Sequence, residues 1–338
     1  MTPEAGGRTG GWPFYGWLGL SLVALFWPLN WFLSGIRTHW GFFPLWLGYA
    51  LTADALAFRG KGNSPLTRNP AAYAGLFLAS APAWWVFELL NLRTENWFYL
   101  GEEAFTTLQF ALFSTVSFST VMPAVFGTAE WMGTLGWLKR IGPGRAIAPT
   151  PLLLRGMFAM GGSMLSLLLL WPDIFFPLVW VSLYCLVEPL NVRLGNPSLL
   201  DHLSRGDWRP VIALGTGCLV CGFFWEMWNF CSYPKWVYRI PFADVLHIFE
   251  MPLPGYLGYL PFSLELFALY NLVAGLLSAR GAPPYLRFTP GDEVKYPPVG
   301  RFGSLSGNPS EQSRYDAAIV FCDHIMYLMF DTSRKKRL

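Results

Sequence analysis

Charged residues are scarce in this sequence, because only 13% of its 338 residues are Asp, Glu, Lys or Arg. Soluble domains carry roughly a quarter. Hydrophobic residues make up 53% and aromatic residues 17%, and long apolar runs recur, such as Gly156 to Trp171 and Pro210 to Phe230. Such runs approach or reach the roughly 20 residues that a membrane-spanning helix needs. The composition argues against a water-soluble fold and predicts an integral membrane protein.

The small net charge, the few histidines and the missing motifs exclude several classes of partner and cofactor. The net charge of +3 is too small to indicate a nucleic-acid partner, and the only basic cluster is Arg334 to Arg337. Four histidines cannot form the clusters of membrane di-iron enzymes, and the sequence contains neither a Gly-rich phosphate loop nor an HExxH motif. The five cysteines form no disulfide framework. We therefore expect no cofactor, no metal and no nucleic acid.

The apolar runs predict an all-α, polytopic membrane helix bundle of about eight transmembrane helices. The first run lacks a convincing signal-peptide cleavage site, so it is interpreted as a transmembrane helix. Residues 1–14 form an N-terminal segment, and residues 279–338 form a tail rich in Pro, Gly, Ser and charge, which is a partner-docking element or an inert cap. The expected spans lie near residues 15–35, 41–58, 71–92, 104–128, 152–171, 174–191, 209–231 and 258–278.

Basic residues between these spans indicate the orientation. Most of them fall on the side that holds both termini, and the other side has only Arg37, Arg93, Lys235 and Arg239. Positive loops stay in the cytoplasm. We therefore expect a multi-pass protein of a bacterial inner membrane with both termini in the cytoplasm.

An internal repeat relates residues 15–150 to residues 151–278. Phe42 to Leu45 matches Phe175 to Leu178, and Phe87 to Asn91 matches Trp225 to Asn229. Several motifs in one order, about 135 residues apart, are hard to obtain by chance. Because four helices per unit is an even number, both copies enter the membrane in the same direction, and the sequence predicts two tandem parallel four-helix repeats.

Two acid–amide pairs lie inside predicted spans. Asn91 follows Glu88 by three positions, and Asn229 follows Glu226 in the same way, so each pair shares one helix face. A charged side chain in the hydrocarbon costs about 2.5–3.5 kcal/mol, so such acids usually face a bundle interior or a cavity and indicate function.

The segment from His247 to Pro261 carries two glycines and three prolines, which predict a broken or re-entrant helix. The corresponding stretch from Phe110 to Val121 has neither residue type, so no break is expected there.

These features together predict an outward-facing intramembrane pocket. Its catalytic candidates are Glu226, Glu88 and Glu265. Its substrate-binding candidates are Asn91, Asn229, His247, Glu250, Trp225, Trp228, Trp97, Trp236 and Tyr238.

A structural interpretation is open for the same residues. The acid–amide pairs would then tie helices together by hydrogen bonds, and His247 would be a satisfied interfacial histidine. Asp54 and Glu188 are expected to form structural ion pairs with Arg59 and Arg193.

The stretches Trp225 to Asn229 and Phe249 to Glu265 resemble a family of uncharacterised bacterial polytopic membrane proteins, a resemblance that implies no particular activity. Trp97 to Tyr99, Trp236 to Tyr238 and Pro261 to Glu265 are distantly similar to the membrane-embedded lycopene and terpene cyclases. Ser263-Leu264-Glu265 stands where the lycopene cyclases have paired glutamates.

Three functions follow as hypotheses. The first is an enzyme in which a buried acid protonates a double bond of an isoprenoid or other lipid while aromatic rings shelter the cation. The second is a transporter or lipid-handling protein. The third is a structural subunit of a membrane complex or a homo-oligomer. Membrane lipids are partners in all three.

Overall fold

The structure is a computed structural model that describes residues 11–33, 39–242, 245–277 and 285–288. The chain divides into a unit of residues 1–294 and a unit of residues 295–338, and the second unit lies wholly outside the described residues. Most of the predicted tail, 279–338, is therefore outside them too.

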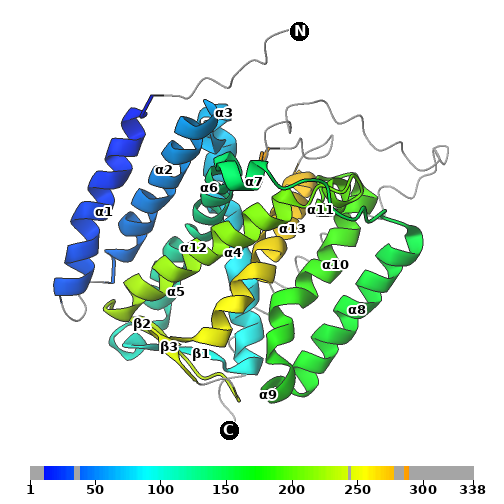
Figure 1. The fold of residues 1–338 in the computed structure, drawn as a ribbon. Coiled ribbons are helices and arrows are strands. Elements are labelled where there is room, and N and C mark those ends of the chain that lie inside the picture. Colours follow the sequence, from blue (N-terminus) through cyan, green and yellow to red (C-terminus); the bar gives the residue numbers. More distant parts are fainter. Residues whose placement is uncertain (1–10, 34–38, 243–244, 278–284, 289–338) are drawn as a thin grey trace. The chain divides into compact units, whose positions relative to one another are not determined.

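The described part of the chain is mostly helical (Figure 1). The helices of the first half are α1 (Phe14–Phe32), α2 (Phe42–Lys61), α3 (Pro65–Arg68), α4 (Pro70–Thr94), α5 (Thr107–Phe118), α6 (Val121–Thr134) and α7 (Gly136–Lys139). Those of the second half are α8 (Pro151–Leu170), α9 (Pro172–Phe175), α10 (Val179–Leu194), α11 (Leu199–Leu203), α12 (Arg209–Phe230) and α13 (Tyr259–Leu277). Single 3₁₀ turns are η2 (Glu102–Ala104) and η3 (Phe176–Leu178), and a longer one is η4 (Leu253–Gly258).

Six helical stretches of the described residues are long and apolar enough to cross a membrane. They are Pro70–Thr94, Thr107–Thr134, Pro151–Leu170, Pro172–Leu194, Arg209–Phe230 and Leu253–Leu277. The structure thus has the multi-pass, helical character that the sequence predicts. Helices α1 and α2 occupy the two remaining predicted spans but are not among the six, so the count of eight stays a prediction.

Capping residues in the sequence fix several helix ends. Ser64 and Thr67 form a capping box at the start of α3, and the side chain of Asn69 accepts a hydrogen bond at the start of α4. Helices α2 and α10 both end at a glycine with positive φ, namely Gly62 (77°) and Gly195 (72°). Left-handed backbone suits glycine because it has no Cβ.

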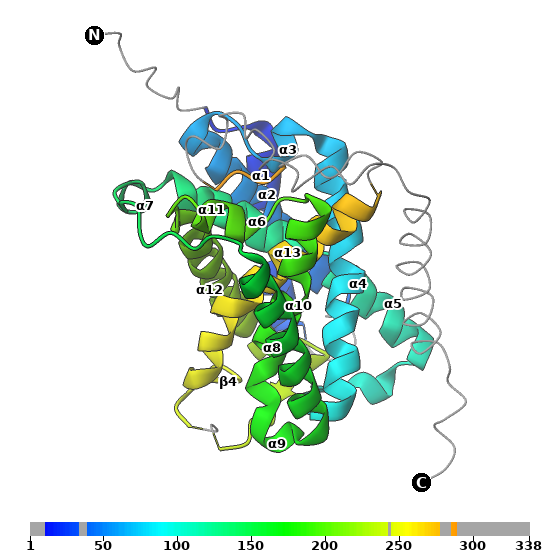
Figure 2. The same ribbon diagram turned by 90° about the vertical axis from the view of Figure 1, so that its right-hand side faces the viewer.

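The helices pack in two similar sets. Helix α2 lies between α1 and α6, and α10 lies between α8 and α13, while α12 contacts both α6 and α13. Helices α3, α7 and α11 lie at one end of the described unit (Figures 1 and 2). The short strands lie at the other end, which we call the sheet end. The core between them contains the fully buried rings of Trp46, Phe87, Phe126, Trp228 and Phe262.

Two small antiparallel sheets form at the sheet end. Strand β1 (Trp97–Leu100) pairs with β2 (Lys235–Tyr238), and Trp97 lies opposite Tyr238 while Tyr99 lies opposite Trp236. Strand β3 (His247–Ile248) pairs with β4 (Met251–Pro252). The predicted irregular segment is therefore a short hairpin followed by η4, with α13 starting at Tyr259.

A second interruption was not expected from the sequence. The stretch from Phe110 to Val121 contains no glycine or proline, yet α5 ends at Phe118 and α6 begins at Val121. The hydroxyl groups of Ser119 and Thr120 donate to the carbonyl oxygens of Val116 and Ser117. Such side-chain bonds compete with the backbone ladder, and they accompany the break without proline.

Candidate functional site

Three donors converge on one carboxylate oxygen of Glu88. Oε1 accepts from Nε1 of Trp84 at 2.9 Å, one turn earlier on α4. It also accepts from Nε1 of Trp97 at 3.1 Å and from Oη of Tyr99 at 2.6 Å, both on β1. The acid on the helix therefore fixes the rings of the strand that follows it.

Glu226 makes the corresponding arrangement in the second half of the chain. Its side chain is fully buried, and Oε1 accepts from Oη of Tyr238 on β2 and from Oη of Tyr259 on α13, both at 2.7 Å. Nε1 of Trp236 donates to Oη of Tyr238 at 2.8 Å. The second carboxylate oxygen of Glu226, Oε2, is buried and accepts no hydrogen bond from the described residues.

The surroundings of Tyr99 on β1 and Tyr238 on β2 keep both phenol groups protonated. Burial raises the pKa of Tyr238 well above its ordinary value, and the neighbouring Glu226 raises it further. Burial and the neighbouring Glu88 do the same to the pKa of Tyr99. Both phenols therefore stay protonated near neutral pH.

The two asparagines anchor the strands through their backbones. Nδ2 of Asn91 donates to the carbonyl oxygen of Trp97 at 2.7 Å, and Oδ1 accepts from the Asn96 amide at 2.9 Å. Nδ2 of Asn229 donates to the carbonyl oxygen of Trp236 at 2.7 Å, and Oδ1 accepts from its amide at 2.9 Å. Each Glu-x-x-Asn pair thus positions the rings with the acid and the strand backbone with the amide.

A cavity of about 430 Å³ lies beside both clusters. Its wall is mostly aromatic and draws on both halves of the chain. Rings from the two clusters line it, together with serines of α5 and glycines of the η4 turn. The lining residues include Trp84, Trp97, Tyr99, Phe110, Ser114, Ser117, Phe118, Val121, Trp180, Trp225, Trp236, Tyr238, Gly255, Gly258, Tyr259 and Phe262.

The structure places the predicted site residues in three ways. Trp97, Trp225, Trp236 and Tyr238 line the cavity. Glu88 and Glu226 lie behind the rings that they bind, so they reach the cavity through phenol and indole groups. The remaining predicted residues, Asn91, Asn229, His247, Glu250, Glu265 and Trp228, are not among the residues that line it.

Several residues of that last group make their contacts outside the cavity. Oε1 of Glu265 accepts from the backbone amides of Leu183 and Tyr184 on α10, at 3.0 and 3.4 Å. Glu250 forms an ion pair with Lys235, and His247 is exposed on β3.

Trp228 is a core ring. It packs against Trp46, with ring centroids 5.0 Å apart.

The expected ion pairs of Asp54 and Glu188 with Arg59 and Arg193 do not form between these described residues. Asp54 accepts from Oη of Tyr15 at 2.8 Å and from the Leu66 amide at 3.0 Å. Glu188 accepts from the Leu200 amide at 2.9 Å. Each acid instead accepts a hydrogen bond from a backbone amide in the first turn of the short helix that follows it, α3 for Asp54 and α11 for Glu188. Amides in the first turn of a helix have no partner within the helix and are therefore available as donors.

Sequence reasoning missed Tyr259 and Trp180, and it did not include Tyr99 among the candidate site residues. Tyr259 could not be assigned because it contacts Glu226 only through the packing of α13 on α12. A signal for Tyr99 was present, because Trp-x-Tyr follows both Glu-x-x-Asn motifs at almost the same distance.

Comparisons with models of protein families, with curated proteins and with solved structures find no match.

Proposed function

We propose that this chain is a membrane enzyme that binds a hydrophobic lipid of the isoprenoid class in the aromatic cavity and acts on it by acid–base chemistry. The observation that carries the proposal is that two carboxyl–phenol pairs border one cavity: Tyr259 with Glu226, and Tyr99 with Glu88. A wall of aromatic rings excludes water and attracts a developing cation by about 0.5–2 kcal/mol per ring.

The two pairs have different surroundings, which suits opposite roles. Three donors converge on Oε1 of Glu88, an arrangement that favours a carboxylate and hence a base. Glu226 is fully buried and its Oε2 lacks a donor among the described residues, an arrangement that favours a neutral carboxyl group and hence an acid. Two acids in contrasting environments are the usual basis for assigning an acid and a base.

The proposed reaction balances without an oxidant or reductant. When Glu226 is protonated, its hydrogen bond with Tyr259 reverses and the carboxyl group donates to Oη. The O–H bond of Tyr259 then breaks as a C–H bond forms on the substrate double bond, and the carboxyl group of Glu226 passes its proton to the phenolate. The carbocation rearranges among the rings. It then loses a proton to Oη of Tyr99, whose own proton passes to Glu88, and exchange with water before the next turnover removes that proton from Glu88 and restores the one on Glu226. The product is an isomer of the substrate, as in a cyclisation or a double-bond shift.

We further propose eight transmembrane helices, formed by the six apolar stretches together with α1 and α2, in two tandem parallel repeats. Three parallels support this: the matched pairing of β1 with β2, the matched contacts of Asn91 and Asn229, and the matched glycine ends of α2 and α10. Both termini then lie in the cytoplasm of a bacterial inner membrane, and the cavity opens towards the outer leaflet.

Deuterium transfer tests the chemistry even while the substrate is unidentified. Purified protein is incubated in D₂O with a bacterial polyprenyl lipid extract, and mass spectrometry follows products that gain deuterium. Glu226→Gln should lower this incorporation by about 10²–10⁴-fold, as expected for loss of a general acid. Glu103→Gln, an exposed acid at the same end of the molecule, is the matched control and should leave it unchanged.

The other functions give different outcomes. Equal incorporation by the wild type and a folded Glu226→Gln variant would contradict the enzyme proposal. If Glu226→Gln and Glu88→Gln abolished lipid or proton movement in vesicles with no incorporation by the wild type, a transporter would replace it. Loss of thermal stability alone would favour a structural subunit.

A further inference from the structure

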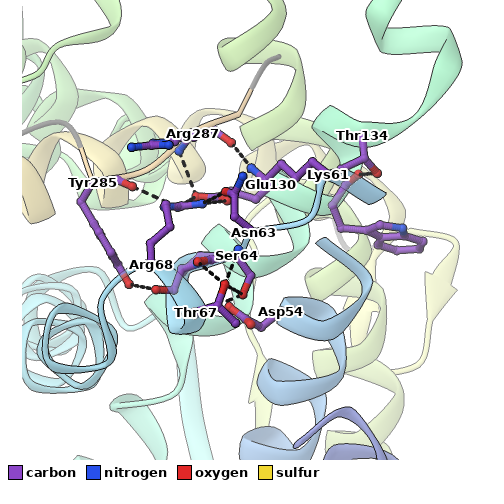
Figure 3. Close-up of polar contacts among 12 residues, drawn as sticks. Asp54, Lys61, Asn63, Ser64, Thr67, Arg68, Glu130, Thr134, Tyr285 and Arg287 are labelled. Carbon is purple, nitrogen blue, oxygen red and sulfur yellow. Dashed lines mark hydrogen bonds and ion pairs between the residues drawn. The ribbon is translucent and has the colours of Figure 1, made fainter. Parts of the chain in front are cut away.

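A second polar cluster lies far from the cavity, at the end of the molecule opposite the sheet end. Its centre is Glu130 of α6, which is fully buried. Nζ of Lys61, the last residue of α2, lies 2.6 Å from Oε2, and Arg68 of α3 binds both carboxylate oxygens (Figure 3). Two cations meet one acid here, and each has donors beyond those that bind Glu130.

These further donors bind the backbone of the segment Tyr285–Phe288. Arg68 donates to the carbonyl oxygen of Tyr285 at 3.0 Å, and Lys61 donates to that of Arg287 at 2.5 Å. The amide of Arg287 donates to Oε1 of Glu130 at 2.9 Å (Figure 3). One buried side chain, Glu130, and two partly buried ones, Lys61 and Arg68, therefore recognise three backbone groups of one short segment.

Tyr285 is the first of two aromatic anchors of this segment. Its Oη donates to the carbonyl oxygen of Pro65 at 2.7 Å, and its ring lies 5.6 Å from the guanidinium group of Arg68. The ring centroid also lies 6.4 Å from that of Tyr270 on α13. Its hydroxyl and its ring face are thus both engaged.

Phe288 is the second anchor. It is 2% exposed and packs against Phe267 of α13, with ring centroids 5.8 Å apart. The backbone of Phe288 lies against Gly133 of α6, where a Cβ atom would stand 1.7 Å from the Phe288 carbonyl oxygen. Only glycine at position 133 leaves room for the segment.

We propose that Lys61, Arg68, Glu130 and Gly133 form a peptide-binding groove whose ligand is the chain's own Tyr285–Phe288 segment. The groove recognises the peptide backbone plus an aromatic residue at the first and fourth positions. Tethering raises the local concentration of the segment to the millimolar range, so even a modest intrinsic affinity keeps the groove filled. The same peptide supplied separately should therefore bind when the tethered copy loses its anchors.

The test uses the full-length protein carrying Tyr285→Ala and Phe288→Ala together. A fluorescently labelled peptide with the sequence of residues 283–290 is titrated into it, and fluorescence anisotropy reports binding. We expect saturable binding to this variant and at least tenfold weaker binding to the wild type, whose groove is occupied. A peptide with alanine at both aromatic positions should also bind at least tenfold more weakly.

A glycine pair controls for the fold. Gly133→Val, added to the double variant, should abolish binding, whereas Gly136→Val should not, because a Cβ at position 136 meets no atom within 4 Å. In the otherwise wild-type protein, Gly133→Val should also raise the rate of trypsin cleavage after Arg287 by at least tenfold. The proposal is overturned if the folded double variant fails to bind the peptide, or if the double variant binds it equally well with and without Gly133→Val.

Discussion

Replacement of Asn229 tests whether hydrogen bonds to the β2 backbone hold the cavity wall in place. Asn229→Ala removes two of them, the donor to the Trp236 carbonyl oxygen at 2.7 Å and the acceptor of its amide at 2.9 Å. Asn229 is fully buried and Trp236 is half-buried. A buried polar group left unsatisfied costs about 1–3 kcal/mol, so two half-buried groups should cost about 2–4 kcal/mol.

The assay is thermal unfolding in a mild detergent, followed by tryptophan fluorescence. One kcal/mol shifts Tm by about 2–4 °C in proteins of 150–250 residues, so Asn229→Ala should lower Tm by roughly 4–8 °C in this longer chain. Asn91→Ala should act in the same direction, since its amide binds Trp97 in the same way. Ser166→Ala on the exposed face of α8 is the control and should leave Tm unchanged.

Asn229→Asp separates hydrogen bonding from packing, because aspartate has the same shape but no donor. At neutral pH it places a carboxylate oxygen against the Trp236 carbonyl oxygen, so it should lower Tm at least as much as alanine. At acid pH a protonated aspartate donates again, and the gap to the wild type at that pH should narrow. If Asn229→Asp melted together with the wild type at neutral pH, the argument from backbone bonding would be wrong.

Three further predictions concern stability. Glu130→Gln removes the acid between two cations and should cost about 3–5 kcal/mol, measured by thermal unfolding of the purified protein. Burial alone would raise the pKa of Asp207, but hydrogen bonds and charge from Arg209 lower it below the ordinary value. Asp207 therefore stabilises the fold above its unfolded pKa of about 3.9, and Asp207→Asn should lower Tm slightly at pH 7 but not once the pH has fallen below the folded pKa. Gly195→Ala should cost about 1 kcal/mol because φ is 72° there, whereas Gly75→Ala, within a helix and with open space at the Cβ position, should be neutral or stabilising in the same assay.

The sequence predicts the helices well because span length and apolarity are local properties. It also predicts that Glu88 shares a helix face with Asn91, because i, i+3 spacing alone decides that relation. The hydrogen-bond partners of these two side chains are harder to predict from the sequence. The acid binds rings and the amide binds backbone, and this division depends on where β1 returns relative to α4.

Contacts across long sequence distances lie beyond such reasoning. Tyr259 reaches Glu226 from another helix, and Tyr285 reaches Arg68 from beyond the last helix. No periodicity encodes these contacts, because they arise from packing between elements. The break before Val121 was missed for a different reason, since serine and threonine interrupt a helix through their own hydrogen bonds rather than through an absent amide proton.

The central claim is that the aromatic cavity holds a lipid, and mass spectrometry of lipids that co-purify with the protein tests it most directly. The variant Ser114→Phe places a ring in the cavity wall, and Ser166→Phe places the same ring on the exposed face of α8. We expect a prenyl or polyene lipid in stoichiometric amount with the wild type and with Ser166→Phe, and its loss from Ser114→Phe. Only bulk phospholipid in all three preparations, or equal retention of the same lipid by folded Ser114→Phe, would contradict the claim.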